Sequence, residues 1–209
     1  MIDSLDEKRS IILNSALPHI VFDGWTDAIL QKAAVESEIE LTQLSILFPK
    51  GAVDAVALHS RMADNALVAE YGEDELFCKQ PVPVKIRQLI LARFKAASQD
   101  KEAVRQGLSL LSFPTHTATG TKLLYETVDT MWNLASDNAT DFNWYTKRLT
   151  LAGVYIATLL LWLNDDCNSP NDTAAFLDRR LDNVKAFGKT KANLVKKFQN
   201  FFLRPSFTK

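Results

Sequence analysis

The sequence has little that could carry cofactor or metal chemistry. Its 209 residues include only two cysteines and three histidines, and these show no spacing typical of a metal site. No complete phosphate-binding loop or hydrolase nucleophile turn is present. Acids that stand close together, Glu126 with Asp129 and Asp165 with Asp166, are explained by helix-surface charge and capping. We therefore expect no enzyme activity, no cofactor and no bound metal.

Long apolar runs and paired cysteines are also missing. Cys78 and Cys167 stand far apart, so we interpret them as free thiols in a reducing compartment. The longest apolar run covers residues 149–163, which is shorter than the roughly 20 residues that span a bilayer. A helix that is apolar on all sides is typical of a protein core or a dimer interface. The acidic N-terminus resembles neither a signal peptide nor an Arg-rich transit peptide.

What the sequence does contain is helical periodicity. Hydrophobic residues make up 47% of the chain, charged residues 23%, and the net charge is −1, which is an ordinary globular composition. No alternating strand pattern occurs, so we expect an all-α fold. The predicted helices cover residues 5–19, a segment capped by Thr26, a very short segment capped by Thr42, residues 52–69, and then 84–97, 101–112, 118–135, 142–164 and 172–187.

One acidic, proline-containing stretch, residues 72–83, divides these helices. Its Pro-Val-Pro sequence is typical of a hinge or a domain boundary. We predict an N-terminal helical region over residues 1–72, a helical body over 81–182 and a C-terminal helix over 183–209.

Three motifs near the N-terminus have a familiar spacing. They are Ile-Leu-Asn-Ser-Ala-Leu at 12–17, Gly-Trp-Thr at 24–26 and the segment 39–49 that ends in Phe-Pro. Their spacing resembles the three-helix head of the TetR-type regulators. The resemblance implies a helix-turn-helix-like bundle followed by a helical body for ligand binding and dimerisation, with residues 42–48 as the recognition helix. A ligand-responsive transcriptional regulator is the main alternative function.

The charge of this head opposes DNA binding. Residues 1–60 contain four basic and nine acidic residues, whereas affinity for duplex DNA comes largely from Lys and Arg. The would-be recognition helix offers Thr42, Gln43 and Ser45 but no Lys or Arg to read a guanine. Where TetR-type proteins tend to carry a tyrosine and a phosphate-binding lysine, this chain has Ser45 and Gly51. We therefore expect no nucleic acid among its partners.

Five further motifs extend across the chain. They are Ala-Leu-Pro-His at 16–19, Phe-Asp-Gly-Trp at 22–25, Leu-Phe-Pro at 47–49, Thr-Asp-Phe-Asn-Trp-Tyr-Thr-Lys-Arg at 140–148 and Phe-Leu-Asp-Arg-Arg-Leu at 176–181. Together they resemble the lipid-binding accessory proteins of ubiquinone biosynthesis, the ninth coenzyme Q protein and its alphaproteobacterial relatives. The resemblance implies a TetR-like homodimer that binds isoprenoid quinone precursors and assists the demethoxy-ubiquinone hydroxylase. A third possibility is a hydroxylase subunit with an activity of its own.

A lipid-binding role implies a dry, elongated cavity lined by aliphatic and aromatic side chains. The body supplies candidates at helical spacings, namely Leu123, Leu124, Met131, Trp132, Tyr155, Leu159 and Trp162. Such stripes belong more often to a protein core, and only the resemblance favours a cavity. We expect a tunnel there that is too large for side chains to fill.

The most specific motif also contains a candidate interface. Its hydrogen-bonding and aromatic residues are Asp141, Asn143, Trp144, Tyr145 and Arg148. Trp, Tyr and Arg are the usual anchors of protein interfaces, so this patch is predicted to bind the partner hydroxylase. The alternative is a capping acid followed by an ordinary helix.

The C-terminal segment has no acidic residue after residue 183 and seven basic ones. Its candidate membrane-binding residues are Lys189, Leu194, Val195, Lys196, Lys197, Phe198, Phe201 and Phe202. This pattern is typical of an amphipathic helix in the headgroup layer of a membrane, although the apolar face could pack on the protein itself. We expect a cytoplasmic protein on the inner face of a bacterial membrane, or on the matrix side in mitochondria.

Overall fold

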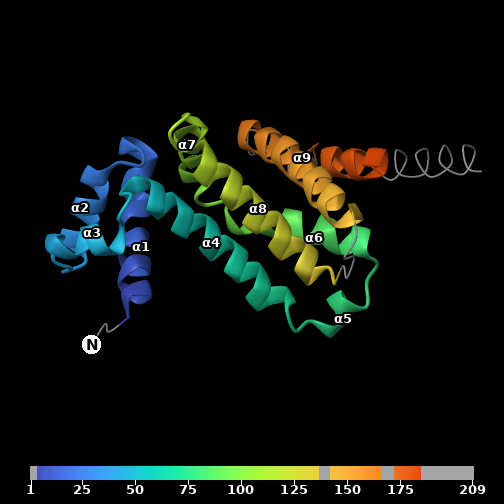
Figure 1. Cartoon of the computed structure of the whole chain (residues 1–209), viewed down its shortest axis with the longest axis horizontal. Helices are drawn as coiled ribbons and strands as arrows, with labels where there is room; N and C mark the ends of the chain where they lie inside the picture. The colour runs from blue at the N-terminus through green and yellow to red at the C-terminus, as the bar shows by residue number, and fades with distance from the viewer. Residues whose placement is uncertain (1–3, 137–141, 166–171, 185–209) are drawn as a thin grey trace, which may run out of the picture.

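The chain folds into helices throughout the part that the structure describes. The computed structural model describes residues 4–136, 142–165 and 172–184, and no strand occurs among them. The elements are α1 (Leu5–Asp23), α2 (Asp27–Glu36), the 3-10 helix η1 (Leu41–Gln43), α3 (Leu44–Leu47), α4 (Ala52–Tyr71), α5 (Glu75–Cys78), α6 (Val82–Ala96), α7 (Lys101–Ser112), α8 (Thr117–Leu134) and α9 (Phe142–Asn164). A further helix covers residues 172–184. The all-α prediction is confirmed (Figure 1).

Side-chain caps explain where the first helices begin. The Ser4 hydroxyl accepts a hydrogen bond from the Glu7 amide at 3.1 Å, and Thr26 does the same for Ile29 at 3.3 Å. The prediction that Thr42 caps the third helix is wrong. Thr42 lies inside η1, and its hydroxyl donates to the Glu40 carboxylate at 3.2 Å. The N-cap residues of η1 and α3 are Glu40 and Gln43, and neither makes a side-chain cap.

The turn before α4 requires glycine. Gly51 has a φ of 56°, and a Cβ atom there would lie 2.1 Å from Oδ1 of Asp27. That carboxylate accepts a hydrogen bond from the Ala52 amide at 2.8 Å, so it satisfies the first turn of α4 from a different helix. The turn thus fixes α4 against α2.

Two hydrophobic cores hold the molecule together, and α4 contributes to both. The head core gathers α1, α2, α3 and the first half of α4, with Ile12 and Leu47 almost fully buried. The body core gathers the end of α4 with α5, α6, α8, α9 and residues 172–184, and includes Leu67 and Leu177. Figure 1 shows α4 running from the head to the far end of the body. The domain division at residues 72 and 81 stays a prediction.

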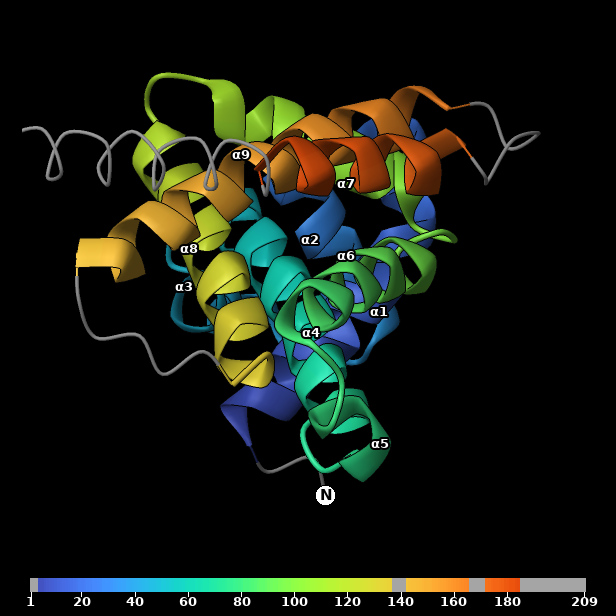
Figure 2. The same cartoon turned by 90° about the vertical axis from the view of Figure 1, so that its right-hand side faces the viewer.

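The stretch between α4 and α6 packs on the body. Phe77 in α5 is 1% exposed. The centre of its ring lies 4.8 Å from the ring centre of Tyr71 and 5.8 Å from Nζ of Lys85. The segment that looked like a hinge therefore contains a helix held by the body core. Residues 172–184 are held in a similar way, because Arg87 of α6 forms an ion pair with Asp178 at 2.5 Å. Figure 2 shows this helix beside α9.

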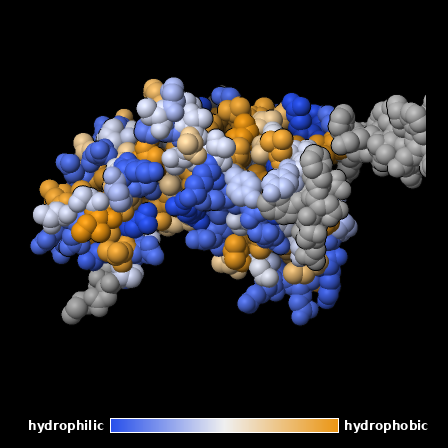
Figure 3. Space-filling model, in the orientation of Figure 1, coloured by the Kyte–Doolittle hydropathy of each residue, from blue (hydrophilic) through white to orange (hydrophobic). Residues whose placement is uncertain are grey.

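Helix α9 is apolar on more than its inner side. By length and composition, its segment Tyr145–Asn164 could cross a membrane. Of the apolar 18-residue stretch in this segment, 39% is buried inside the protein. Leu151 and Tyr155 face the body core, whereas Leu149 is 77% exposed. Figure 3 shows apolar residues at the surface over α9. The predicted central helix is therefore a core helix that also has an uncovered apolar face.

Candidate functional site

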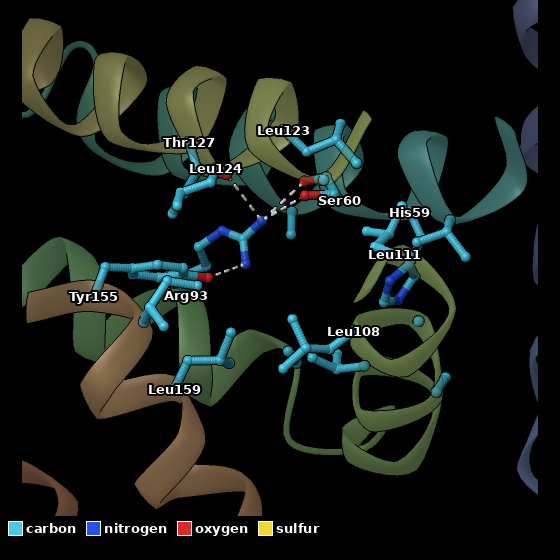
Figure 4. A pocket seen from close by; sticks show the side chains of 18 of the residues that line it. His59, Ser60, Arg93, Leu108, Leu111, Leu123, Leu124, Thr127, Tyr155 and Leu159 are labelled. Atoms are coloured by element: carbon cyan, nitrogen blue, oxygen red, sulfur yellow. Dashed lines mark hydrogen bonds between the residues drawn. The ribbon is translucent and has the colours of Figure 1, made fainter. Parts of the chain in front are cut away.

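A cavity opens in the body where five helices meet, beside the loop before α2. Its lining includes His59, Ser60, Arg93, Leu108, Leu111, Leu123, Leu124, Thr127, Tyr155 and Leu159 (Figure 4). The enclosed volume is about 110 Å³, and the empty space is about 700 Å³ when the region open to solvent is included. Most of the wall is aliphatic, so the polar side chains define what the cavity can recognise.

Arg93 organises the polar part of the wall. Its Nε donates to the Asp64 carboxylate at 2.8 Å, and its Nη1 donates to the Tyr155 hydroxyl at 2.6 Å. Its Nη2 donates to the hydroxyl of Ser60 at 2.9 Å and to that of Thr127 at 3.4 Å. Figure 4 shows the bonds to Tyr155, Ser60 and Thr127 converging on one guanidinium group. A buried charge is thus surrounded by hydrogen-bond partners, as its burial requires.

The charge states of this cluster follow from burial. Burial alone would lower the pKa of Arg93, but Tyr155 and Asp64 outweigh it and the pKa is raised. Burial raises the pKa of Tyr155. At neutral pH the Tyr155 group is therefore a phenol, which has a proton to donate.

His59 and Trp25 form another part of the lining. The Trp25 Nε1 donates to the backbone oxygen of Ala103 at 2.8 Å, which ties the head to α7. The His59 ring lies 5.8 Å from the Trp25 ring, and its Nε2 lies 3.6 Å from Asp100. Burial lowers the pKa of His59, although Asp100 acts in the opposite direction. The imidazole is therefore neutral at physiological pH, with one donor and one acceptor nitrogen.

Comparisons with known proteins connect this architecture to a family. Residues 117–188 match the COQ9 family model. The chain is 29% identical to the ubiquinone biosynthesis protein COQ9, mitochondrial, of Rattus norvegicus over 90% of its length, and 26% identical to that of Homo sapiens, also over 90%. The Schizosaccharomyces pombe protein is 28% identical over 86% of the chain. The chain is thus similar to COQ9 proteins over most of its length.

The COQ9 match does not extend over the whole of the relatives. The chain covers 62% of the rat protein, 61% of the human protein and 70% of the fission yeast protein. A TetR transcriptional regulator from Nitrosomonas europaea has the same fold, with a TM-score of 0.68 and 20% identity over 83% of this chain and 95% of its own. The TetR-like fold expected from the sequence is confirmed.

The cavity of the body includes part of the predicted lipid-binding set. Leu123, Leu124, Tyr155 and Leu159 line it. Met131, Trp132 and Trp162 do not line this cavity, and their role in lipid binding stays a prediction. Met131 is fully buried in the body core, the Trp162 ring stacks on Phe94 at 5.2 Å, and Lys147 lies over the Trp132 ring. Helical spacing gave the correct helices, but it could not distinguish a cavity wall from a packed core.

The cavity is also smaller than expected. Sites for drug-sized ligands enclose about 300–1,000 Å³, whereas this one encloses about 110 Å³. This cavity is therefore not a tunnel of the size that a long isoprenoid tail requires. Its size suits a small ring or headgroup.

Sequence reasoning missed the polar wall of the cavity. Ser60 and Asp64 are four residues apart on α4, on the same helical face as the apolar Val56 and Leu67. Polar residues on an apolar face are a usable signal of a buried site. Their partner Arg93 gave no such signal, because α6 carries several other basic residues.

The structure alters the predicted COQ9-type interface patch. Tyr145 is 70% exposed, as an interface anchor should be. Arg148 is 5% exposed, and its Nε donates to Asp129 at 2.7 Å, so its assignment as an exposed anchor was wrong. Asn143 and Trp144 lie in α9, and their side chains lie outside the described set, as does the whole of Asp141. The remaining candidates stay a prediction.

The acids of the head are engaged within the head. Glu36 accepts hydrogen bonds from His19 at 3.0 Å and Ser15 at 2.9 Å, and the bond from His19 is the main reason its pKa is lowered. Gln43, in the segment that reads DNA in TetR-type proteins, accepts a hydrogen bond from Lys8 at 3.0 Å. Lys8 and Gln43, which could both have faced DNA, are therefore hydrogen-bonded to each other.

Two other groups of candidates have a simple outcome. The predicted membrane-binding residues, from Lys189 to Phe202, lie outside the described residues. Glu126 and Asp129 both form ion pairs, Glu126 with the partly exposed Arg61 at 2.9 Å and Asp129 with the buried Arg148 at 2.7 Å. Among the described residues, no group of three or more His, Cys, Asp or Glu side chains could hold a metal ion.

Proposed function

We propose that this chain is a non-enzymatic accessory protein of ubiquinone biosynthesis. It binds an isoprenoid quinone precursor and presents it to the demethoxy-ubiquinone hydroxylase. The observation that carries the proposal is the cavity of the body, which combines aliphatic walls with a few converging polar groups. The relatives named as ubiquinone biosynthesis proteins supply the class of ligand.

The cavity is too small for the whole ligand, so the ring or headgroup and the tail lie in different environments. About 110 Å³ accommodates a ring or a headgroup, and the tail extends through the open mouth. Outside, the tail needs apolar surface or a bilayer.

Mass spectrometry of lipids that co-purify with the native full-length chain tests this function. The expression host must itself make ubiquinone. The Leu124→Trp variant fills the cavity from α8 and should lose the bound precursor, whereas Leu76→Trp, at a site 76% exposed, should retain it. Equal precursor content in both variants, or none in the unmodified chain, contradicts the proposal.

We assign the partner hydroxylase to the surface around Tyr145, because Tyr145 is an exposed aromatic residue within the specific motif at 140–148. Replacing Trp144 or Tyr145 by Ala should weaken that complex without unfolding the chain. A pull-down with the hydroxylase measures this. Unchanged affinity with both residues replaced would remove the assignment.

The homodimer is proposed to form through α9 and residues 172–184. Leu149 and Leu160 are exposed, and the space around Gly153 is open within 4 Å of where a Cβ would be. A charge at the centre of such an apolar face disrupts association. Leu149→Glu should therefore convert a dimer to a monomer in light scattering, and a wild-type chain that is already monomeric would contradict the proposal.

Membrane binding is assigned to the C-terminal segment. In flotation on anionic vesicles the full-length chain should rise with the lipid, and replacing Phe198 and Phe201 by Glu should abolish this. The matched control is Phe22→Glu, since Phe22 is an exposed phenylalanine of the head. We propose peripheral attachment to the membrane that contains the quinone pool.

The regulator alternative is tested with the same protein. The head has four basic and nine acidic residues up to residue 60, so phosphates would be repelled. A gel-shift assay at low salt should show no duplex binding. Tight binding that weakens as salt is added would instead favour a transcriptional regulator.

A further inference from the structure

We propose that an exposed turn of the head binds the basic C-terminal segment, residues 185–209, of a second copy of this chain. The turn comprises residues 35–41, at the end of α2 and before η1, and we call it the acidic turn. The inference goes beyond the proposed function, which makes no use of this surface. Three features of the acidic turn support it: its charge, its exposed apolar side chains and its place in the molecule.

The charge of the acidic turn is not balanced locally. Glu36, Glu38 and Glu40 stand at alternate positions, and all three are exposed. The C-terminal end of a helix favours cations, yet α2 has no basic residue in its last turn. Within the head, Glu36 and Glu40 bond to two hydroxyl groups and an imidazole, not to a Lys or an Arg. Among the residues that the structure describes, the Glu38 carboxylate has no hydrogen bond or ion pair. The turn therefore attracts a positively charged partner.

Apolar side chains border these acids. Val35 and Leu41, at the two ends of the acidic turn, are 62% and 49% exposed, and Ile46 on α3 is 66% exposed. Figure 3 shows apolar residues at the surface of the head near α3. A partner that fits this surface has basic and apolar side chains together, as a basic amphipathic segment does.

The chain itself contains such a segment. Residues 185–209 lie outside the described residues, but their sequence has seven basic residues and no acid. Aromatic and aliphatic residues are interleaved with these, among them Leu194, Phe198 and Phe201. Residues 1–60, in contrast, contain nine acidic and four basic residues. The two ends of the chain are therefore complementary in charge, which guides their encounter and selects this pairing.

The place of the acidic turn assigns it to a second copy. Figure 1 shows α2 and the helix of residues 172–184 at opposite ends of the molecule, so the C-terminal segment of the same chain begins far from the turn. The segment of another copy can approach the turn from solvent. The same apolar residues are assigned above to the membrane, so the acidic turn competes with a membrane for this segment.

Zero-length cross-linking of the full-length chain, without lipid, tests the inference. A carbodiimide joins a lysine amine to a carboxylate when the two are in contact. In an equal mixture of isotope-labelled and unlabelled chains, Lys196 and Lys197 should be linked to Glu38 or Glu40. Peptide pairs of mixed isotope should show that the contact is between copies. Glu73, an exposed acid between α4 and α5, is the internal reference and should form few such links.

The variants identify the surface responsible. The double variant Leu41→Ser, Ile46→Ser should lower the yield of mixed-isotope links about tenfold, because two apolar side chains leave the contact. Val68→Ser is the matched control, since Val68 is 47% exposed on α4 and its replacement should leave the links unchanged. If circular dichroism shows that the double variant does not fold, Glu38→Lys still decides. It reverses the charge of an exposed side chain and should likewise lower the yield of links to Glu40.

Three results overturn the inference: links that occur only within one chain, links as frequent at Glu73 as at the acidic turn, and links that persist in the variants. The proposed function is tested separately, by lipid analysis and by flotation on vesicles. A segment that floats with vesicles but is not linked to the turn rejects this inference alone. Mixed-isotope links at the turn in a chain that carries no quinone precursor reject only the proposed function.

Discussion

Arg93 and Asp64 form an ion pair inside the body, with 2.8 Å between Nε and Oδ1 and side chains that are 9% and 8% exposed. The pair joins α6 to α4, and through Tyr155 and Thr127 it reaches α9 and α8. It therefore links four of the five helices around the cavity. Burying the pair removes two charges from water, which costs free energy. Only this set of hydrogen bonds offsets that cost.

Removing the cation should destabilise the chain strongly. Arg93→Met keeps the volume of the side chain but leaves Asp64 as a buried, unpaired charge, which costs about 3–5 kcal/mol. The free energy of unfolding in urea measures this. Arg61→Met is the control, because the Arg61–Glu126 pair is 43% and 31% exposed and contributes about 0–1 kcal/mol. Similar losses in the two variants would contradict the role given to Arg93.

Acid should destabilise the chain through His59. Burial lowers its pKa below the ordinary 6.5, so the unfolded chain takes up the proton more readily. The stability that depends on neutral His59 is therefore fully present above about pH 7. It is lost as the pH falls through the pKa of His59 in the unfolded chain toward its lower pKa in the folded chain. The His59→Phe variant should lose less stability between about pH 7.5 and pH 5.5 than the wild type, measured by urea midpoints. His116→Gln is the matched control, and the same pH dependence in wild type and His59→Phe would refute this.

One indole contributes to the connection between head and body. Trp25 is 7% exposed, and its Nε1 donates to the Ala103 oxygen at 2.8 Å. Trp25→Phe removes that buried hydrogen bond and should lower the free energy of unfolding by about 1–2 kcal/mol. Phe22→Leu, at a side chain 86% exposed, should change it by less than about 0.5 kcal/mol. Circular dichroism during urea unfolding provides the comparison.

Two neighbours on α9 should behave differently. Tyr145→Ala removes an exposed ring and should leave stability within about 0.5 kcal/mol of the wild type. Arg148→Met removes the buried partner of Asp129, which is 32% exposed, and should cost about 1–3 kcal/mol. If thermal unfolding shows Arg148→Met to be neutral, Arg148 is not a structural residue and its assignment to the interface returns.

The helices and the head could be predicted from the sequence, because their signals are local. Thr26 caps α2 as expected, and helices expected at 101–112 and 142–164 have those bounds. Thr42 shows the limit of such signals. Its hydroxyl has a nearby acid, Glu40, as a competing acceptor, and the sequence does not reveal which hydrogen bond forms.

The cavity could be predicted only in part. Leu123, Tyr155 and Leu159 do line a cavity, since helical spacing identifies inward faces. The same spacing placed Met131 and Trp162 in the wall, although both pack in the core. Whether an inward side chain meets another side chain or a void depends on how all five helices pack, and one helix carries no record of the others.

The sequence alone determined the all-α fold, the acidic head and the motifs that connect the chain to its relatives, because each depends on the order of residues within one or two helices. Tertiary structure decided which residues line the cavity, that Arg148 is buried, and that Ser60, Asp64, Arg93, Thr127 and Tyr155 meet. These five residues extend over nearly a hundred positions of the chain, and no local pattern encodes their meeting. Packing of α4 against α6, α8 and α9 brings them together. Because they are buried there, their charges and protons affect the stability of the fold and the chemistry of the cavity.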